Sequence, residues 1–101
     1  MFRMNMEEET LFQKIMGDNP RIKVFEYLVE WKGYDISISD LARGAGISRN
    51  TATEIVRELL EQKILKPTRN VGNAQFFVLN RENKISQQIL KLFKTVIELT
   101  A

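Results

Sequence analysis

The sequence predicts a small, mostly helical domain that contains one β-hairpin, which is an α+β fold class. Two observations carry this prediction. Several segments repeat apolar residues at spacings of three and four, and residues 64–79 contain two β-prone runs on either side of a stretch with Gly72. The 101 residues are enough for one domain with one hydrophobic core, and no repeat or linker divides them.

The composition excludes several kinds of chemistry. The chain contains no cysteine and no histidine, so it lacks thiolate nucleophiles, disulfides, the usual general base at neutral pH and the commonest transition-metal ligand. The carboxylates of Glu54, Glu58 and Glu61 have the spacing of a solvated helix face. We expect no enzyme activity, no metal site and no cofactor.

No segment has the character of a membrane span or a secretory signal. The longest apolar runs, such as residues 76–79, are far shorter than the roughly 18 residues that a membrane span needs. Acidic residues 7–9 follow the first residues, where a secretory signal would carry a hydrophobic stretch. These features favour a cytoplasmic protein.

Two amphipathic helices are expected in the first third of the chain. Acidic residues 7–9 favour the start of a first helix and Gly17 its end, and its apolar face consists of Leu11, Phe12 and Ile15. Asn19 and Pro20 suit the N-cap and first position of a second helix, which should run to about residue 32 and stop at Gly33.

The middle of the chain predicts a short strand, a brief helix, a tight turn and a longer helix. Alternating isoleucine and serine over residues 36–39 suit a strand, and Ser39 is expected to cap the brief helix. Gly44 lies inside that helix, where a glycine costs about 1 kcal/mol relative to alanine. Ser48 should cap the longer helix, whose inward face consists of Ala52, Ile55, Val56, Leu59 and Leu60.

The last third predicts the hairpin and a final helix. Residues 64–66 form the first expected strand, which Pro67 ends, and residues 68–74 form a loop. Residues 75–79 form the second strand. Asn80 should cap a helix that continues through Leu99.

Residues 39–52 carry the most specific signal. Two helices that cross steeply need a small residue where they touch, here Ala42. Gly46 supplies the positive φ that the turn requires, and Ile47 plugs the corner between the helices. This stretch resembles the helix-turn-helix of bacterial and archaeal winged-helix transcription regulators of the MarR and ArsR kind.

The resemblance covers residues 19–81 well and the flanking helices more loosely. It implies a winged helix-turn-helix with flanking N- and C-terminal dimerisation helices. The domain organisation is then an N-terminal helix in residues 1–18, a winged-helix core in residues 19–81 and a C-terminal dimerisation helix in residues 82–101.

The longer helix is the expected recognition helix for the DNA major groove. Because its apolar row turns inward, the side chains that point outward are Asn50, Thr53, Glu54 and Arg57, and Arg49 lies on the flank of the first turn. Ser48 and Thr51 can cap the helix and also donate to phosphate. The arginines can pair with guanine or phosphate, and Asn50 with adenine. Glu54 either accepts a hydrogen bond from cytosine or orients Arg57 or Arg49.

A localised basic strip adds to this interface. Residues 63–81 contain four cations and no acid, although the formal net charge is only +2. In the family that the chain resembles, the hairpin is a wing whose loop lies along the minor groove. The residues implied there are Lys63 and Lys66 at the root and Arg69, Asn70 and Asn73 at the tip.

The last helix predicts a homodimer. One apolar stripe consists of Ile85, Ile89, Leu92, Val96 and Leu99, and a second one contains Leu90, Phe93 and Ile97. A helix at the end of one small domain can cover only one stripe with its own core, so the other should meet a second copy. The dimerisation residues expected from these stripes and the first helix are Leu11, Phe12, Ile15, Ile85, Ile89, Leu92, Phe93, Val96 and Leu99.

The function that follows is sequence-specific binding of double-stranded DNA by a homodimeric transcription regulator. Two alternatives remain: a winged-helix protein-interaction module, and a plasmid or viral replication or partition protein that binds DNA. A small-molecule effector, if one exists, is expected to be an organic ligand at the dimer interface, and the sequence does not identify it.

Overall fold

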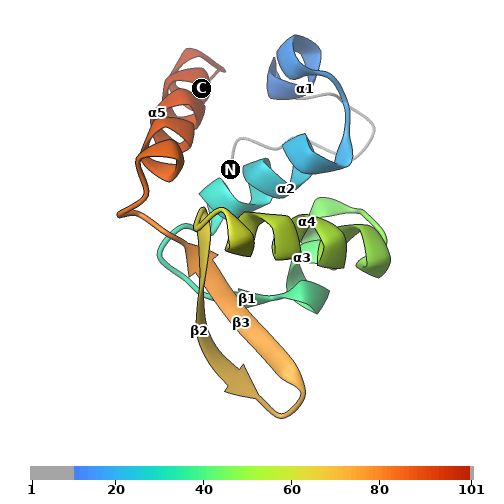
Figure 1. Cartoon of the computed structure of the whole chain (residues 1–101). Helices are drawn as coiled ribbons and strands as arrows, with labels where there is room; N and C mark the ends of the chain where they lie inside the picture. Colours follow the sequence, from blue (N-terminus) through green and yellow to red (C-terminus); the bar gives the residue numbers. More distant parts are fainter. Residues whose placement is uncertain (1–10, 101) are drawn as a thin grey trace.

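A computed structural model describes residues 11–100 of the chain (Figure 1). These residues form five helices and three strands. In order they are α1 (Leu11–Met16), α2 (Pro20–Glu30), β1 (Ile36–Ser37), α3 (Ile38–Ala45), α4 (Arg49–Glu61), β2 (Leu65–Val71), β3 (Ala74–Leu79) and α5 (Lys84–Thr100).

The core lies between α2, α3, α4 and a three-stranded antiparallel sheet. The strand order is β1-β3-β2, so β3 is the central strand. The buried residues that form this core are Val24, Leu28, Ile36, Leu41, Ala42, Ala45, Ala52, Ile55, Val56, Leu59, Ile64, Leu65, Phe77 and Leu79. Four of the five residues expected on the inward face of α4 belong to it, and Leu60 is half-buried beside it.

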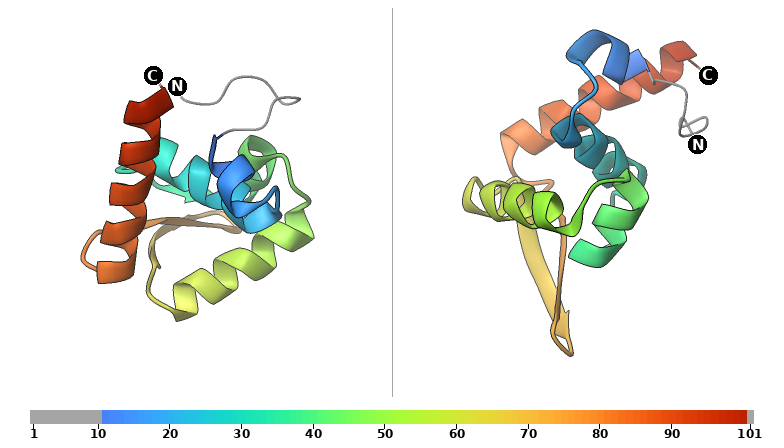
Figure 2. Two further views of the ribbon diagram at one scale, coloured as in Figure 1. Left: turned by 90° about the horizontal axis from the view of Figure 1, so that it is seen from above. Right: turned by 90° about the vertical axis from the view of Figure 1, so that its right-hand side faces the viewer.

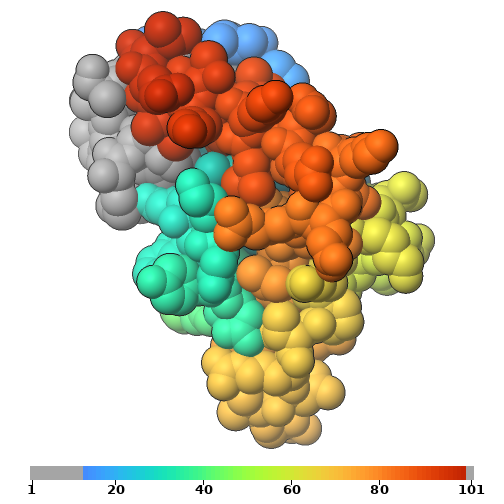
Figure 3. All heavy atoms as spheres, turned by 90° about the vertical axis from the view of Figure 1, so that its left-hand side faces the viewer, coloured from blue at the N-terminus to red at the C-terminus, as the bar shows by residue number. Residues whose placement is uncertain are grey.

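The hairpin of β2 and β3 extends away from the helices, and α5 lies at the other end of the molecule (Figure 2). The space-filling view shows the hairpin as a separate projection below the body (Figure 3). Within residues 11–100, no helix has the length and hydropathy needed to cross a membrane.

The inner face of α5 packs against α2 of the same chain. Phe93 and Val96 are 3% and 9% exposed and form a second buried cluster with Val29. The prediction that Phe93 and Val96 are dimerisation residues is therefore wrong, because the chain's own α2 covers them. Ile89 is half-buried against both clusters.

The hairpin is longer than the sequence predicted. Pro67 does not end the first strand, and β2 continues to Val71 with an irregularity in the register between Pro67 and Arg69. β2 is an edge strand, so it has no neighbouring strand on its outer side. A proline is tolerated in such a strand because its missing N–H removes no hydrogen bond on that side. Only Gly72, with φ +60°, and Asn73 connect the two strands.

Two predicted helix caps are wrong by a few residues. Ser37, not Ser39, caps α3, since its side chain accepts from the Asp40 N–H while the Asp40 carboxylate accepts from the Ser37 N–H. Asn83, not Asn80, accepts from the first amides of α5, those of Ile85 and Ser86. The predicted caps Asn19 of α2 and Ser48 of α4 are confirmed.

Gly44 is required by packing, although the sequence suggested only a weakness in α3. A Cβ added at Gly44 would overlap the ring of Tyr27 on α2. Helix propensity alone predicts that Gly44→Ala raises the free energy of unfolding by about 1 kcal/mol. We expect instead a decrease of about 1–3 kcal/mol in urea denaturation, because the ring must move out of its packed position. An increase would show that Tyr27 relaxes freely.

Candidate nucleic-acid interface

The turn between α3 and α4 has the geometry that the sequence predicted. Gly46 adopts φ +71°, and the N–H groups of Gly46 and Ile47 both donate to the Ala42 carbonyl at 3.0 Å. Ala42 is buried where the helices meet, and Ile47 packs against the core. This turn holds α4 across α3 with its N-terminal part at the surface (Figure 1).

Two of the predicted contact residues also cap α4. The Ser48 hydroxyl oxygen accepts from the Thr51 N–H at 3.1 Å, and the same hydroxyl donates to Thr51 Oγ1 at 2.9 Å. These bonds satisfy one of the free amides at the start of the helix. Both hydroxyls therefore have a structural role in α4 before any contact with DNA.

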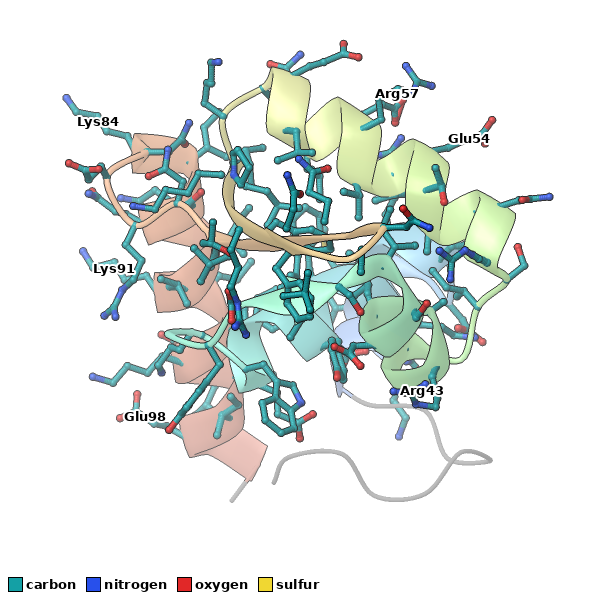
Figure 4. All side chains as sticks on the ribbon, turned by 90° about the horizontal axis from the view of Figure 1, so that it is seen from below. Arg43, Glu54, Arg57, Lys84, Lys91 and Glu98 are labelled. Atoms are coloured by element: carbon teal, nitrogen blue, oxygen red, sulfur yellow. The ribbon has the colours of Figure 1, made fainter. Side chains whose placement is uncertain are left out.

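The outward face of α4 is exposed as predicted. Arg49, Asn50, Thr53, Glu54 and Arg57 are all solvent-exposed, and Figure 4 shows the labelled side chains of Glu54 and Arg57 pointing away from the body. The Thr53 hydroxyl donates to the Arg49 carbonyl at 2.8 Å, which leaves its oxygen free to accept. These residues form one polar surface, which we call the α4 face.

The pairing of charges on the α4 face settles one alternative. Arg57 pairs with Glu61 at 3.3 Å, and Arg49 donates to Ser39 on α3. Glu54 therefore orients neither arginine, contrary to one of the two roles suggested for it. Within residues 11–100, the side chains of Asn50 and Glu54 have no hydrogen-bond or ion-pair partner, which leaves both available to base edges.

Arg69 lies in β2 rather than at the tip of the hairpin. Its guanidinium pairs with the Asp35 carboxylate through two bonds of 2.8 and 3.3 Å and lies 4.7 Å from the centre of the Phe76 ring. Thr68 donates to the same carboxylate at 2.7 Å. The hydrogen bonds from Thr68 and Arg69 hold the pKa of Asp35 below its ordinary value.

Sequence reasoning missed Asp35, because no local pattern links it to residues more than thirty positions away. We call this contact the Asp35 brace. It joins the segment before β1 to β2 across the central strand, since β1 and β2 both pair with β3. The brace therefore holds the hairpin against the body.

The tip and root of the hairpin carry the remaining predicted residues. At the tip, Asn70 and Asn73 are exposed beside Val71, which is 52% exposed, and the tip itself carries no charge. At the root, Lys63 is exposed and Lys66 lies 3.9 Å from Glu82 in a loose surface pair. The structure thus places the predicted residues on two neighbouring elements, the α4 face and the hairpin.

Solved structures share this arrangement of helices and hairpin. The chain is similar to the adhesin competence repressor AdcR from Streptococcus pyogenes, with a TM-score of 0.62 and 19% identity over 77% of this chain. It is also similar to a homodimeric winged helix-turn-helix DNA-binding domain from Mycobacterium bovis, a possible ArsR-family regulator, with a TM-score of 0.58 and 15% identity. The fold is a winged helix-turn-helix.

The winged-helix similarity covers different shares of these proteins. The match spans 56% of the length of the AdcR chain. For the Mycobacterium bovis domain it covers 84% of this chain and 73% of that domain. With the AntR antimony-specific transcriptional repressor the match covers 97% of this chain and 94% of that one, at 16% identity and a TM-score of 0.60. No family model matches the sequence, and no curated protein is significantly similar to it.

Proposed function

We propose that this winged-helix protein is a sequence-specific, double-stranded DNA-binding transcription regulator that acts as a homodimer and has no catalytic role. The observation that carries the proposal is the α4 face, where two unpaired polar side chains at the exposed start of a helix lie beside a projecting hairpin. A recognition helix in this fold places such residues against base edges in the major groove. The regulators with the same fold support the assignment.

The contacts divide between sequence reading and backbone binding. Glu54 and Arg57, which project from the outer side of α4 in Figure 4, would read bases, as would the exposed Asn50. Ser48, Arg49, Thr51 and Thr53 would bind phosphates at the start of the helix. Lys63 and Lys66 would bind the backbone from the hairpin root, and Asn70 and Asn73 would contact the minor groove from its tip.

The exposed row of α5 supports the homodimer. Ile85, Leu92 and Leu99 are 55%, 49% and 76% exposed, and their spacing of seven places them in one row beside the buried face. Ile15 on α1 is also exposed, at 63%, while the side chains of Leu11 and Phe12 lie outside the described part of the structure. Pairing with a second copy would remove this apolar row from water.

The charges beside this row favour an antiparallel pairing of two α5 helices. Lys84, Lys91 and Glu98 also repeat every seven residues and lie along the outer edge of α5 (Figure 4). In a two-fold antiparallel pair centred near Lys91, Lys84 faces Glu98 of the second copy and this contact occurs twice, against a single like-charge contact between the two Lys91 side chains at the axis. A parallel pair would place both lysines beside half-buried or buried apolar residues instead.

Charge reversal tests this orientation. We expect Lys84→Glu and Glu98→Lys each to weaken dimerisation, by about threefold to tenfold, and the double variant to regain most of the loss. Sedimentation equilibrium measures the dimer dissociation constant. Additive losses in the double variant would contradict the antiparallel contact.

The Asp35 brace predicts a variant with tighter DNA binding. In Asp35→Asn the guanidinium of Arg69 is released for phosphate, and one negative charge near DNA is removed. We expect severalfold tighter binding to all duplexes and a salt slope steeper by about 1. Asp18→Asn is the matched control, because its carboxylate pairs with Lys23 far from the hairpin in sequence. Weaker binding would mean that the brace presents the hairpin to DNA.

The same brace depends on pH in a defined direction. Because the folded pKa of Asp35 lies below its ordinary value, its contribution to stability is complete above that ordinary value and is lost as the pH falls through the folded pKa. The protection of the hairpin amides, measured relative to the intrinsic exchange rate at each pH, should therefore decrease in strongly acidic solution and in Asp35→Asn.

Selection of bound sequences from a random duplex pool tests the proposed function. Enrichment of a palindrome supports a homodimeric DNA reader, and no enrichment favours a protein-interaction module. The genomic position of the enriched sites then separates a transcription regulator from a replication or partition protein. Titration of the purified protein with its best duplex provides the affinity at stated salt.

A further inference from the structure

We propose that three side chains at the start of α5 position the recognition helix relative to the dimerising helix. Asn80, Asn83 and Ser86 lie between the end of β3 and the first turn of α5, and we call them the clasp. The inference rests on the proposed function, since its consequence is the spacing at which a dimer reads two half-sites.

Each member of the clasp donates to one of three successive carbonyls at the end of α4. Asn83 Nδ2 donates to the Gln62 carbonyl at 3.3 Å, and Asn80 Nδ2 donates to the Lys63 carbonyl at 2.9 Å. The Ser86 hydroxyl donates to the Ile64 carbonyl at 3.0 Å. The Asn80 backbone N–H adds a second bond to that carbonyl at 2.8 Å.

The clasp members are themselves held in place. Ser86 is fully buried, and Asn83 uses its Oδ1 to accept from the first amides of α5. Asn80 Oδ1 accepts from the Glu82 N–H at 3.2 Å. Each asparagine thus has its oxygen bound to its own loop and its nitrogen bound to the end of α4. The end of α4 and the loop before α5 are therefore expected to move together.

The end of α4 is a Schellman motif, in which the N–H groups of Lys63 and Ile64 donate to the carbonyls of Leu60 and Leu59. Lys63 has φ +63° and is the only residue other than glycine with positive φ in the described chain. A non-glycine residue keeps this conformation only where its surroundings determine it. Here the carbonyl of Lys63 and those of both its neighbours are bound by the clasp.

Packing acts beside the clasp, since Ile89 and Leu90 of α5 lie against the core to which α4 contributes. α5 packs mainly on α1 and α2, whereas α4 packs on α2, α3 and β2. The clasp therefore provides the hydrogen-bonded connection between the C-terminal end of α4 and the start of α5. When two α5 helices pair in a dimer, the clasp of each chain fixes the position of its recognition helix α4 relative to the paired helices.

The variant Asn80→Asp combined with Asn83→Asp removes the two asparagine donors of the clasp and leaves the Ser86 bond in place. Each aspartate keeps the acceptor oxygen that binds its own loop but loses the N–H₂ donor. Its negative charge is unfavourable beside carbonyls at a helix C-terminus. Asn19→Asp is the matched control, because Asn19 caps α2 with its oxygen and has no contact with the clasp. Circular dichroism should show unchanged helix content in all three proteins.

A distance measurement tests the clasp without DNA. The chain contains no cysteine, so spin labels can be attached at Glu61→Cys on α4 and Lys94→Cys on α5. In dimers diluted with unlabelled protein, we expect a narrow distance distribution for the wild type and the Asn19→Asp control. The clasp variant should give a distribution about twofold broader. An equally narrow distribution in the clasp variant would overturn the proposal.

A DNA experiment tests the consequence. The wild type should prefer half-sites one helical turn apart over the same half-sites moved by about two base pairs. In the clasp variant this preference should fall by about tenfold when both spacings are compared within the same variant, so that the added negative charge, which weakens binding to every duplex, cancels in the ratio. An undiminished preference would overturn the role of the clasp in spacing. A wild type that binds no DNA would contradict the proposed function, while the distance measurement would still decide whether the clasp positions α4.

Discussion

Replacing both Leu92 and Leu99 with glutamate is expected to convert the protein to monomers and to weaken binding to its palindromic site by about a hundredfold or more. Both side chains are exposed in the single chain, so the substitutions leave its core intact. In a dimer they would place carboxylates in a desolvated apolar seam. Once the seam is lost, the second half-site no longer benefits from the effective concentration that the dimer provides.

Light scattering and fluorescence anisotropy measure the two parts of this prediction. Lys94→Glu is the control, because Lys94 is exposed on α5 outside the row of Leu92 and Leu99. Val96 is not a suitable target, since its burial against α2 means that a charge there would damage the fold itself. A wild type that is monomeric at tens of micromolar would contradict the dimer.

The second large effect is expected at Arg57. Arg57→Ala should weaken the best site by about 1–3 kcal/mol and relax the preference at one base pair. The pair between Arg57 and Glu61 is exposed on both sides, so breaking it costs the free energy of folding little. The loss therefore reports on DNA contact rather than on stability.

Lys66→Ala provides the contrast that makes the result specific. Lys66 lies at the hairpin root with a loose contact to Glu82, and its ammonium would meet only the DNA backbone. We expect weaker binding to all duplexes by a similar factor and a salt slope lower by about 1. Titration of both variants on specific and scrambled duplexes at several salt concentrations measures the difference. The same behaviour in both variants would contradict the division into base and backbone contacts.

The turn at the centre of the fold was predictable because its signals are local. Gly46 must adopt positive φ, and Ser48 must cap the helix that follows within two residues. The apolar row of α4 then decides which side faces inward. These features depend on backbone conformation and side-chain spacing within one short segment. The exposure of the α4 face could therefore be predicted from the local sequence, without knowledge of the segments that pack against it.

The predictions that were wrong concern features that depend on contacts with distant parts of the chain. The strand through Pro67 is possible only because β2 is an edge strand, and a sequence does not show which strand lies at an edge. The actual caps Ser37 and Asn83 lie within three residues of the predicted ones, since several serines and asparagines near each helix start could serve. In these cases several strand ends or cap residues were compatible with the local sequence, and tertiary contacts determined which one occurs.

The sequence by itself determined that this chain forms a winged helix-turn-helix with an outward polar face on α4 and more apolar surface on α5 than one core can cover. Only the tertiary structure decided that Phe93 belongs to that core and Leu92 to the open row. It also decided that Arg69 is held by Asp35 and that Gly44 makes room for Tyr27. The physical reason is that helical periodicity and turn chemistry act between near neighbours in sequence, whereas burial and charge pairing depend on which distant segments meet.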